Sequence, residues 1–101
     1  MSANPARGEA ALTIAGEERV LRPSFAALVA AEEELGPLFA LVERAGRGEL
    51  SLADIAALFW FCQHGPAPLP REDIGEAVVA MGLAGAAAPL KAVLGQILRG
   101  R

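Results

Sequence analysis

The sequence has few of the residues that build reactive or cross-linked sites. It contains one cysteine, one histidine, one tryptophan and no tyrosine among its 101 residues. A single cysteine excludes a disulfide within the chain, and one cysteine with one histidine cannot supply the four ligands of a closed zinc site. Both features suit a reducing compartment, so we expect a cytoplasmic protein.

Positive charge and long apolar runs are also scarce. Nine Lys and Arg against twelve Asp and Glu give a net charge of −3, the wrong sign for a surface that binds phosphates. The longest uncharged run, residues 55–70, has 16 residues including three prolines, whereas a bilayer span needs about 20 apolar residues. The first nine residues lack the apolar region of a signal peptide. We therefore expect neither a nucleic acid nor a membrane as partner.

What the chain has in excess is apolar residues. Hydrophobic residues make up 53% of the chain and 22 residues are alanine, and the mean hydropathy is +0.38. This composition in so short a chain is typical of one compact folded domain. We expect residues 1–8 to form a disordered tail and residues 9–101 to form a single domain. Because alanine buries little area, we expect modest stability from the monomer alone.

Residues 9–22 predict a two-stranded β-hairpin, because apolar and β-branched residues lie on both sides of a short polar turn. One register would place Leu12 opposite Leu21. A slip by one residue would instead pair Ile14 with Val20. The free edges of such a hairpin are candidate sites for pairing with another chain.

About five short helices are expected in the helical part, residues 24–99. Their limits are set by capping residues, glycines and prolines. The expected segments are 24–36, 37–46, 51–65, 71–82 and a last helix that begins between Ala84 and Pro89. Ser24 is the expected N-cap of the first, and Ser51 with Asp54 forms the capping box of the third. The predicted fold class is thus α+β, mainly α.

Two residues depart from the apolar stripes of the first two helices. Glu32 lies in the middle of the stripe that includes Phe25 and Val29, and a carboxylate there is costly unless it is paired or hydrated. It either forms an ion pair or marks a seam that a partner closes. The candidate cations are Arg19, Arg22 and Arg44. Phe39 lies off the stripe of the second helix, where it either covers the hairpin, which we favour, or is exposed.

Apolar residues occupy almost every side of the third helix between positions 52 and 62. Such a helix is either central and covered all round, which we favour, or partly exposed. In the second case Trp60 and Phe61 are the expected anchors, because aromatic residues dominate binding interfaces. The candidate partner-binding residues of the whole chain are Trp60, Phe61, Leu94, Leu98 and Glu32.

The sequence offers no motif for catalysis or cofactor binding. Cys62 and His64 are two residues apart, so on a helix their side chains would not face each other as a nucleophile and its base. The glycine-containing stretches match neither a phosphate-binding loop nor a dinucleotide fingerprint. We therefore expect no enzymatic activity, no cofactor and no metal.

Short apolar and glycine patterns recur over residues 8–98. They are residues 8–16, residues 20–28 with Glu32 and Gly36, residues 50–55 with Trp60, and residues 74–76 with 82–83. In these patterns the chain resembles a small protein family that is encoded in the tail module of alphaproteobacterial gene transfer agents and related prophages. Members carry two labels, tail assembly chaperone and tail tube protein, and neither implies catalysis.

The resemblance implies one of two roles in a phage-like tail. Tail tube subunits generally form rings from β-sandwich or barrel-like sheets, whereas this chain has strand signal for one hairpin only. We therefore expect a tail assembly chaperone, which would bind apolar helical segments of the tape measure protein. The third helix and the stripe of the last helix would border its groove. A structural tail component, as tube or connector subunit, is the alternative, and the partners would be the tape measure or other tail proteins, with a homo-oligomer as a further option.

A small helix-turn-helix regulator is the rival from another class. It would use the third and fourth helices to enter the DNA groove. The fourth helix, however, carries Glu72, Asp73 and Glu76 on its outward face, and these carboxylates would repel phosphates. A DNA-binding role is accordingly the least favoured of the three.

Overall fold

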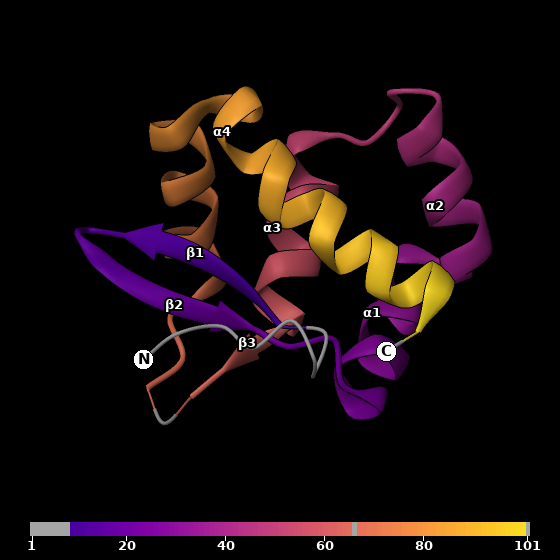
Figure 1. Ribbon diagram of the computed structural model, residues 1–101, viewed down its shortest axis with the longest axis horizontal. Coiled ribbons are helices and arrows are strands. Elements are labelled where there is room, and N and C mark those ends of the chain that lie inside the picture. Colours follow the sequence, from indigo (N-terminus) through magenta and orange to yellow (C-terminus); the bar gives the residue numbers. More distant parts are fainter. Residues whose placement is uncertain (1–8, 66, 101) are drawn as a thin grey trace.

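Three short strands and four helices follow one another along the chain in the computed structural model, which describes residues 9–65 and 67–100 (Figure 1). They are β1 (Ala10–Ile14), β2 (Glu17–Leu21), α1 (Phe25–Leu35), α2 (Leu38–Gly46), α3 (Leu52–Phe61), β3 (Gln63–His64) and α4 (Arg71–Arg99). This order confirms the predicted α+β, mainly α class. The expected disordered tail, residues 1–8, lies outside the described residues.

The hairpin turn has only two residues, and both have a positive φ angle. Ala15 has φ 53° and Gly16 has φ 81°, as a tight two-residue hairpin turn requires. Leu12 therefore lies opposite Arg19 and not opposite Leu21. The register slipped by one residue is equally wrong. The shorter turn shifts every pair of the ladder relative to the expectation, which had placed the turn further along the chain.

A third strand replaces the expected end of the third helix. We expected this helix to reach Gly65, but α3 ends at Phe61, and β3 pairs antiparallel with the last two residues of β2. The Arg22 backbone N–H continues this contact by donating to the Cys62 carbonyl at 2.7 Å. The Gln63 side chain accepts a hydrogen bond from the Leu69 backbone N–H at 2.8 Å, which fixes the connector to α4.

α3 is the central element of the fold. It packs against α4 and α1, while α4 also packs against β1 (Figure 1). Every residue from 55 to 59 is buried, and Leu58 and Phe59 are completely inaccessible. This confirms the interpretation of the third helix as the central core helix, although Leu52 in its first turn is 43% exposed and is not covered as expected.

α4 is bent at Gly82, where the backbone leaves the helical region with φ 78° and ψ 160°. The expected stop at Gly82 is confirmed, but the chain resumes its helix at residue 83, earlier than expected. By length and composition alone α4 is long and apolar enough to cross a membrane. The longer part of α4 after the bend, however, has only 17 residues. At about 1.5 Å per residue this part is about 25 Å long, which is shorter than the bilayer core of about 30 Å. Ile74, Val78 and Val93 on the inner side of α4 are fully buried.

The capping box at the start of α3 is confirmed. The Ser51 hydroxyl accepts from the Asp54 backbone N–H, and the Asp54 carboxylate accepts from the Ser51 backbone N–H, both at 3.1 Å. Arg44 donates to the same carboxylate at 3.0 Å and ties α2 to α3. Burial raises the pKa of Asp54, but the hydrogen bonds from Ser51 and Arg44 outweigh it and hold the pKa below its ordinary value.

Asp54→Asn should lower the free energy of unfolding at about pH 7 by about 1 to 3 kcal/mol, because hydrogen bonds to a charged group contribute about this much. Since the folded-state pKa of Asp54 is lowered, this stabilisation is complete above the ordinary aspartate pKa of about 3.9 and is lost as the pH falls through the folded value. Urea unfolding of the wild type and of Asp54→Asn should therefore show a difference in the free energy of unfolding that narrows towards about pH 3. A difference in the free energy of unfolding that does not change with pH would contradict this role for the carboxylate.

Candidate binding surface

Glu32 caps the helix that follows its own. Its carboxylate accepts a hydrogen bond from the Leu38 backbone N–H at 3.1 Å, at the start of α2, where the N-cap residue Pro37 offers no side-chain bond. A negative charge is also favourable at this end of the helix dipole. The expected ion pair of Glu32 is wrong, because the three candidate arginines pair elsewhere. Arg19 lies beside Glu17, Arg22 beside Glu9 and Arg44 beside Asp54.

Glu32 and Leu98 line the same pocket, although they are far apart in the sequence. The pocket has a volume of about 260 Å³ and lies where α1, α2 and the last turns of α4 meet. Its other lining residues are Pro37, Leu38, Phe39, Val42 and Ile97. The walls are thus almost entirely apolar, with the capping carboxylate at one side.

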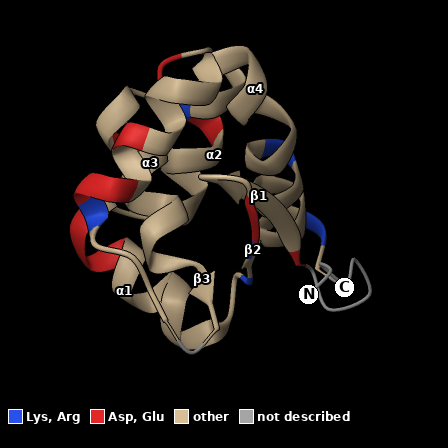
Figure 2. Cartoon of the chain, turned by 90° about the vertical axis from the view of Figure 1, so that its left-hand side faces the viewer, with Lys and Arg blue, Asp and Glu red and all other residues tan. Residues whose placement is uncertain are grey.

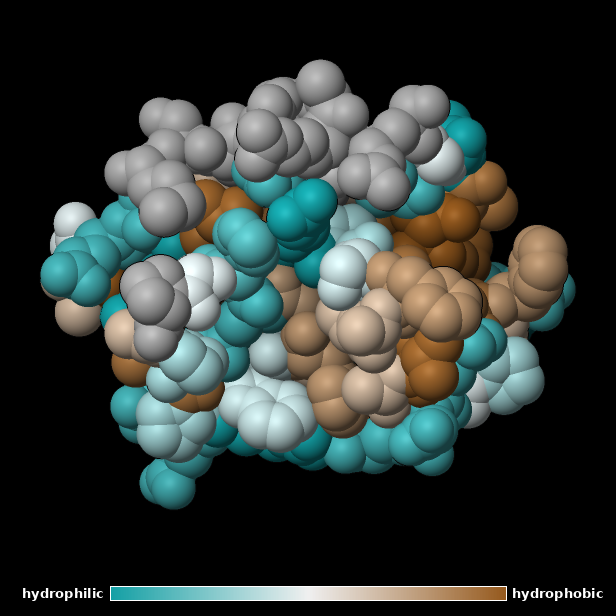
Figure 3. All heavy atoms as spheres, turned by 90° about the horizontal axis from the view of Figure 1, so that it is seen from below, coloured by the Kyte–Doolittle hydropathy of each residue, from teal (hydrophilic) through white to brown (hydrophobic). Residues whose placement is uncertain are grey.

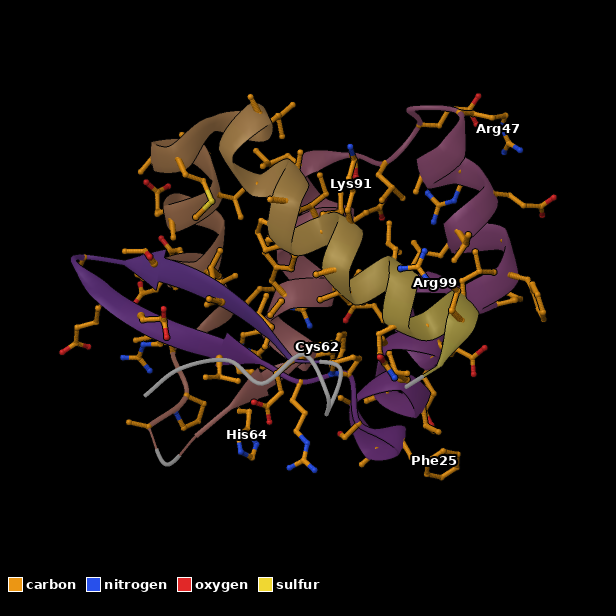
Figure 4. The ribbon with its side chains drawn as sticks, in the orientation of Figure 1. Phe25, Arg47, Cys62, His64, Lys91 and Arg99 are labelled. Carbon is orange, nitrogen blue, oxygen red and sulfur yellow. The ribbon has the colours of Figure 1, made fainter. Side chains whose placement is uncertain are left out.

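Exposed apolar side chains lie in this pocket and along α1, the helix that carries Glu32. Phe25 on α1 is 86% exposed, Phe39 on α2 is 81% exposed and Leu98 on α4 is 60% exposed, and Val29 is also exposed on α1. We call these four residues and the pocket the end face. Figure 3 shows the apolar area spreading over α1 and the neighbouring end of the molecule, and in Figure 4 Phe25 points away from the body of the protein.

The exposure of Phe25 and Val29 corrects the expectation that they belong to the buried stripe of the first helix. The inward side of α1 is formed instead by Ala31, which is fully buried, and by the partly buried Ala27 and Leu28. Phe39 is likewise exposed on α2 and does not cover the hairpin. Small alanines let α1 approach α3 closely, so the large side chains are displaced to the outer side.

Trp60 and Phe61 lie half-buried in a different place, under an ion pair. Their rings meet edge to face with centroids 4.9 Å apart, and the Arg71 guanidinium lies 4.4 Å from the Trp60 ring centroid and 5.2 Å from that of Phe61. Arg71 also donates two hydrogen bonds to Glu34, at 2.5 and 2.9 Å. This bonding lowers the pKa of Glu34 and raises the pKa of Arg71. The cluster joins the end of α3 to α1 and α4.

The five candidate residues therefore do not form one surface. Glu32 and Leu98 meet at the end face, Trp60 and Phe61 lie under Arg71, and Leu94 is partly buried against the core. A binding role for these five residues stays a prediction. Three end-face residues, Phe25, Val29 and Phe39, were missed as candidates, and the only signal for them in the sequence was the position of Phe39 off its stripe.

The reactive side chains are not arranged for chemistry. Burial raises the pKa of the Cys62 thiol to about 12, whereas His64 is exposed on β3 (Figure 4). Within residues 9–65 and 67–100 there is no group of three or more His, Cys, Asp and Glu side chains that could hold a metal ion. Charged residues form short segments on an otherwise uncharged ribbon (Figure 2), and Glu72, Asp73 and Glu76 are exposed on α4.

The fold and this surface define a small, mainly helical α+β protein with an exposed apolar face. The chain belongs to the family described as phage tail tube protein, GTA-gp10, whose family model matches residues 7–100. It is therefore a phage-like tail protein, and the resemblance to the tail module of gene transfer agents is confirmed. The family is one of structural tail proteins and is not known as a family of enzymes. Comparison with curated proteins and with solved structures gave no match.

Proposed function

We propose that this protein is a tail assembly chaperone that binds apolar helical segments of the tape measure protein on its end face, in the cytoplasm. The observation that carries the proposal is the set of exposed apolar side chains on α1, α2 and α4, two of which, Phe39 and Leu98, line the pocket between these helices. Two phenylalanines with high exposure are costly to leave in water, and apolar faces of this kind are typical of sites that receive an amphipathic helix.

The small amount of sheet supports a chaperone over a tube subunit. Within the described residues the sheet has three strands, of which β3 has only two residues, and α3 and α4 supply most of the core. Tail tube subunits generally build their rings from β-sandwich or barrel-like sheets, and the described residues form neither. The family description nevertheless names a tail tube protein, so a structural tail component remains the second candidate. Finding the protein in stoichiometric amount in purified particles would favour it.

The test is co-expression with a tape measure protein from the same genome. Leu98→Ser should lower the soluble amount of the tape measure protein at least about fivefold, because the loss of one interface anchor costs more than about 1 kcal/mol. Leu83→Ser is the matched control, since Leu83 lies on the same helix and is 63% exposed against 60% for Leu98. It should leave solubility unchanged.

Both variants should retain the fold, because substitutions of exposed residues change stability by no more than about 0.5 kcal/mol. Circular dichroism of the purified variants shows whether the fold is retained before the co-expression results are compared. Equal solubility with Leu98→Ser and Leu83→Ser would overturn the assignment of binding to the end face. Phe39→Ser provides an independent variant on α2 with the same expected loss.

A further inference from the structure

We propose that the end face selects amphipathic helices that carry Lys or Arg beside their apolar side. This inference rests on the proposed function and adds the charge of the segment that is bound. It follows from how carboxylates are placed around the exposed apolar side chains.

On both α1 and α2, a glutamate follows the exposed apolar side chains of the end face on the same side of the helix. On α1, Phe25, Val29 and Glu33 follow one another at intervals of four residues, and on α2, Phe39 and Glu43 are four residues apart. Residues four apart are neighbours on one side of a helix. Glu33 and Glu43 are both exposed. A helix that covers the apolar residues would therefore have acidic groups beside it.

No cation among residues 9–65 and 67–100 balances these two carboxylates. Within the described residues, the side chains of Glu33 and Glu43 form neither an ion pair nor a hydrogen bond. The neighbouring arginines have other partners, since Arg44 lies beside Asp54, Arg47 beside Glu49 and Arg71 beside Glu34. Arg99 turns back over Gly95, where an added Cβ would lie 2.5 Å from its guanidinium.

The same charges argue against a second copy of this chain as the occupant. In a two-fold symmetric contact the end face would meet itself, and the carboxylates of both copies would approach one another. Like charges opposed across an interface are destabilising, and the whole chain already carries a net charge of −3. A helix with cations at its flanks meets the same surface with complementary charge.

Two synthetic peptides test the proposal with the intact protein. Both carry leucines at intervals of three and four residues, and the flanking positions hold Lys in one peptide and Glu in the other. Because each exposed ion pair strengthens binding by at most about fivefold, the Lys peptide should bind about tenfold more tightly at about 50 mM salt. Fluorescence anisotropy measures both affinities. The preference should almost vanish at about 500 mM salt, where exposed charges are screened.

Variants locate the effect on the end face. The double variant Glu33→Gln with Glu43→Gln should reduce the preference for the Lys peptide to about twofold. The matched control, Glu72→Gln with Glu76→Gln, removes the same charge from exposed positions of α4 and should leave the preference unchanged. Leu98→Ser should weaken the binding of both peptides.

Three results would overturn the inference: equal binding of the two peptides, equal effects of the two double variants, or no binding of either peptide. Equal binding that Leu98→Ser weakens would leave the proposed function intact, because the apolar contact would then act without charge selection. The proposed function fails separately, when Leu98→Ser leaves the tape measure protein soluble in co-expression.

Discussion

Replacing Phe59 by alanine will lower the free energy of unfolding by about 3 to 5 kcal/mol. The ring of Phe59 is completely inaccessible in the last turn of α3, the helix on which α1 and α4 pack. Its loss removes apolar burial and leaves a cavity that the surrounding helices fill only in part. A domain of about 100 residues is stable by only about 5 to 15 kcal/mol. The variant should therefore lie close to the limit of folding.

Phe25→Ala is the matched control, because the same side chain is removed from a site that is 86% exposed. It should change the free energy of unfolding by no more than about 0.5 kcal/mol. Urea denaturation followed by circular dichroism measures both variants. Similar losses for the two phenylalanines would contradict the central position of α3 and the exposed position of Phe25.

Most element limits could be predicted because they depend on local signals. The capping box of Ser51 and Asp54 and the cap at Ser24 are sequence patterns with their own hydrogen bonds, and both are present. Gly36 ends α1 with a positive φ angle, and Gly82 interrupts α4 in the same way. The central position of α3 could be predicted because a helix with apolar residues on all sides has to be covered.

The errors concern features that local patterns do not determine. β3 has only two residues, too few for an alternating pattern, and it is a strand because β2 presents free backbone groups beside it. The hairpin register depends on Ala15, a residue other than glycine with a positive φ angle, which propensity does not indicate. In both cases the tertiary arrangement decides.

The candidate surface could be predicted only in part. Glu32 and Leu98 were singled out and do line one pocket, but the reason for Glu32 was different, since it caps α2 and does not pair with an arginine. The helical spacing of large apolar residues predicts Phe25 and Val29 on the inner side of α1, but both are exposed. The inner side of α1 is instead built on Ala31. In a chain rich in alanine, the close approach of helices is decided by small residues.

Gly82→Ala should lower the free energy of unfolding by about 1 to 3 kcal/mol, because φ 78° with ψ 160° is a backbone conformation that only glycine adopts without strain. An added Cβ would meet nothing within 4 Å, so the cost is conformational and not a clash. Gly46 is the control, since it is helical and has equally open space around it. Gly46→Ala should raise stability by up to about 1 kcal/mol.

The bend at Gly82 also directs the second part of α4 towards α2, which brings Leu98 to the pocket (Figure 1). Gly82→Ala should therefore reduce the solubility of the co-expressed tape measure protein, while Gly46→Ala should not. Thermal or urea unfolding of the purified variants measures the loss of stability, and co-expression measures the loss of tape measure solubility, so the two effects are determined separately. A Gly82→Ala protein that is as stable as the wild type would contradict the strain at residue 82, and unchanged solubility of the tape measure protein would contradict the role of the bend in placing Leu98.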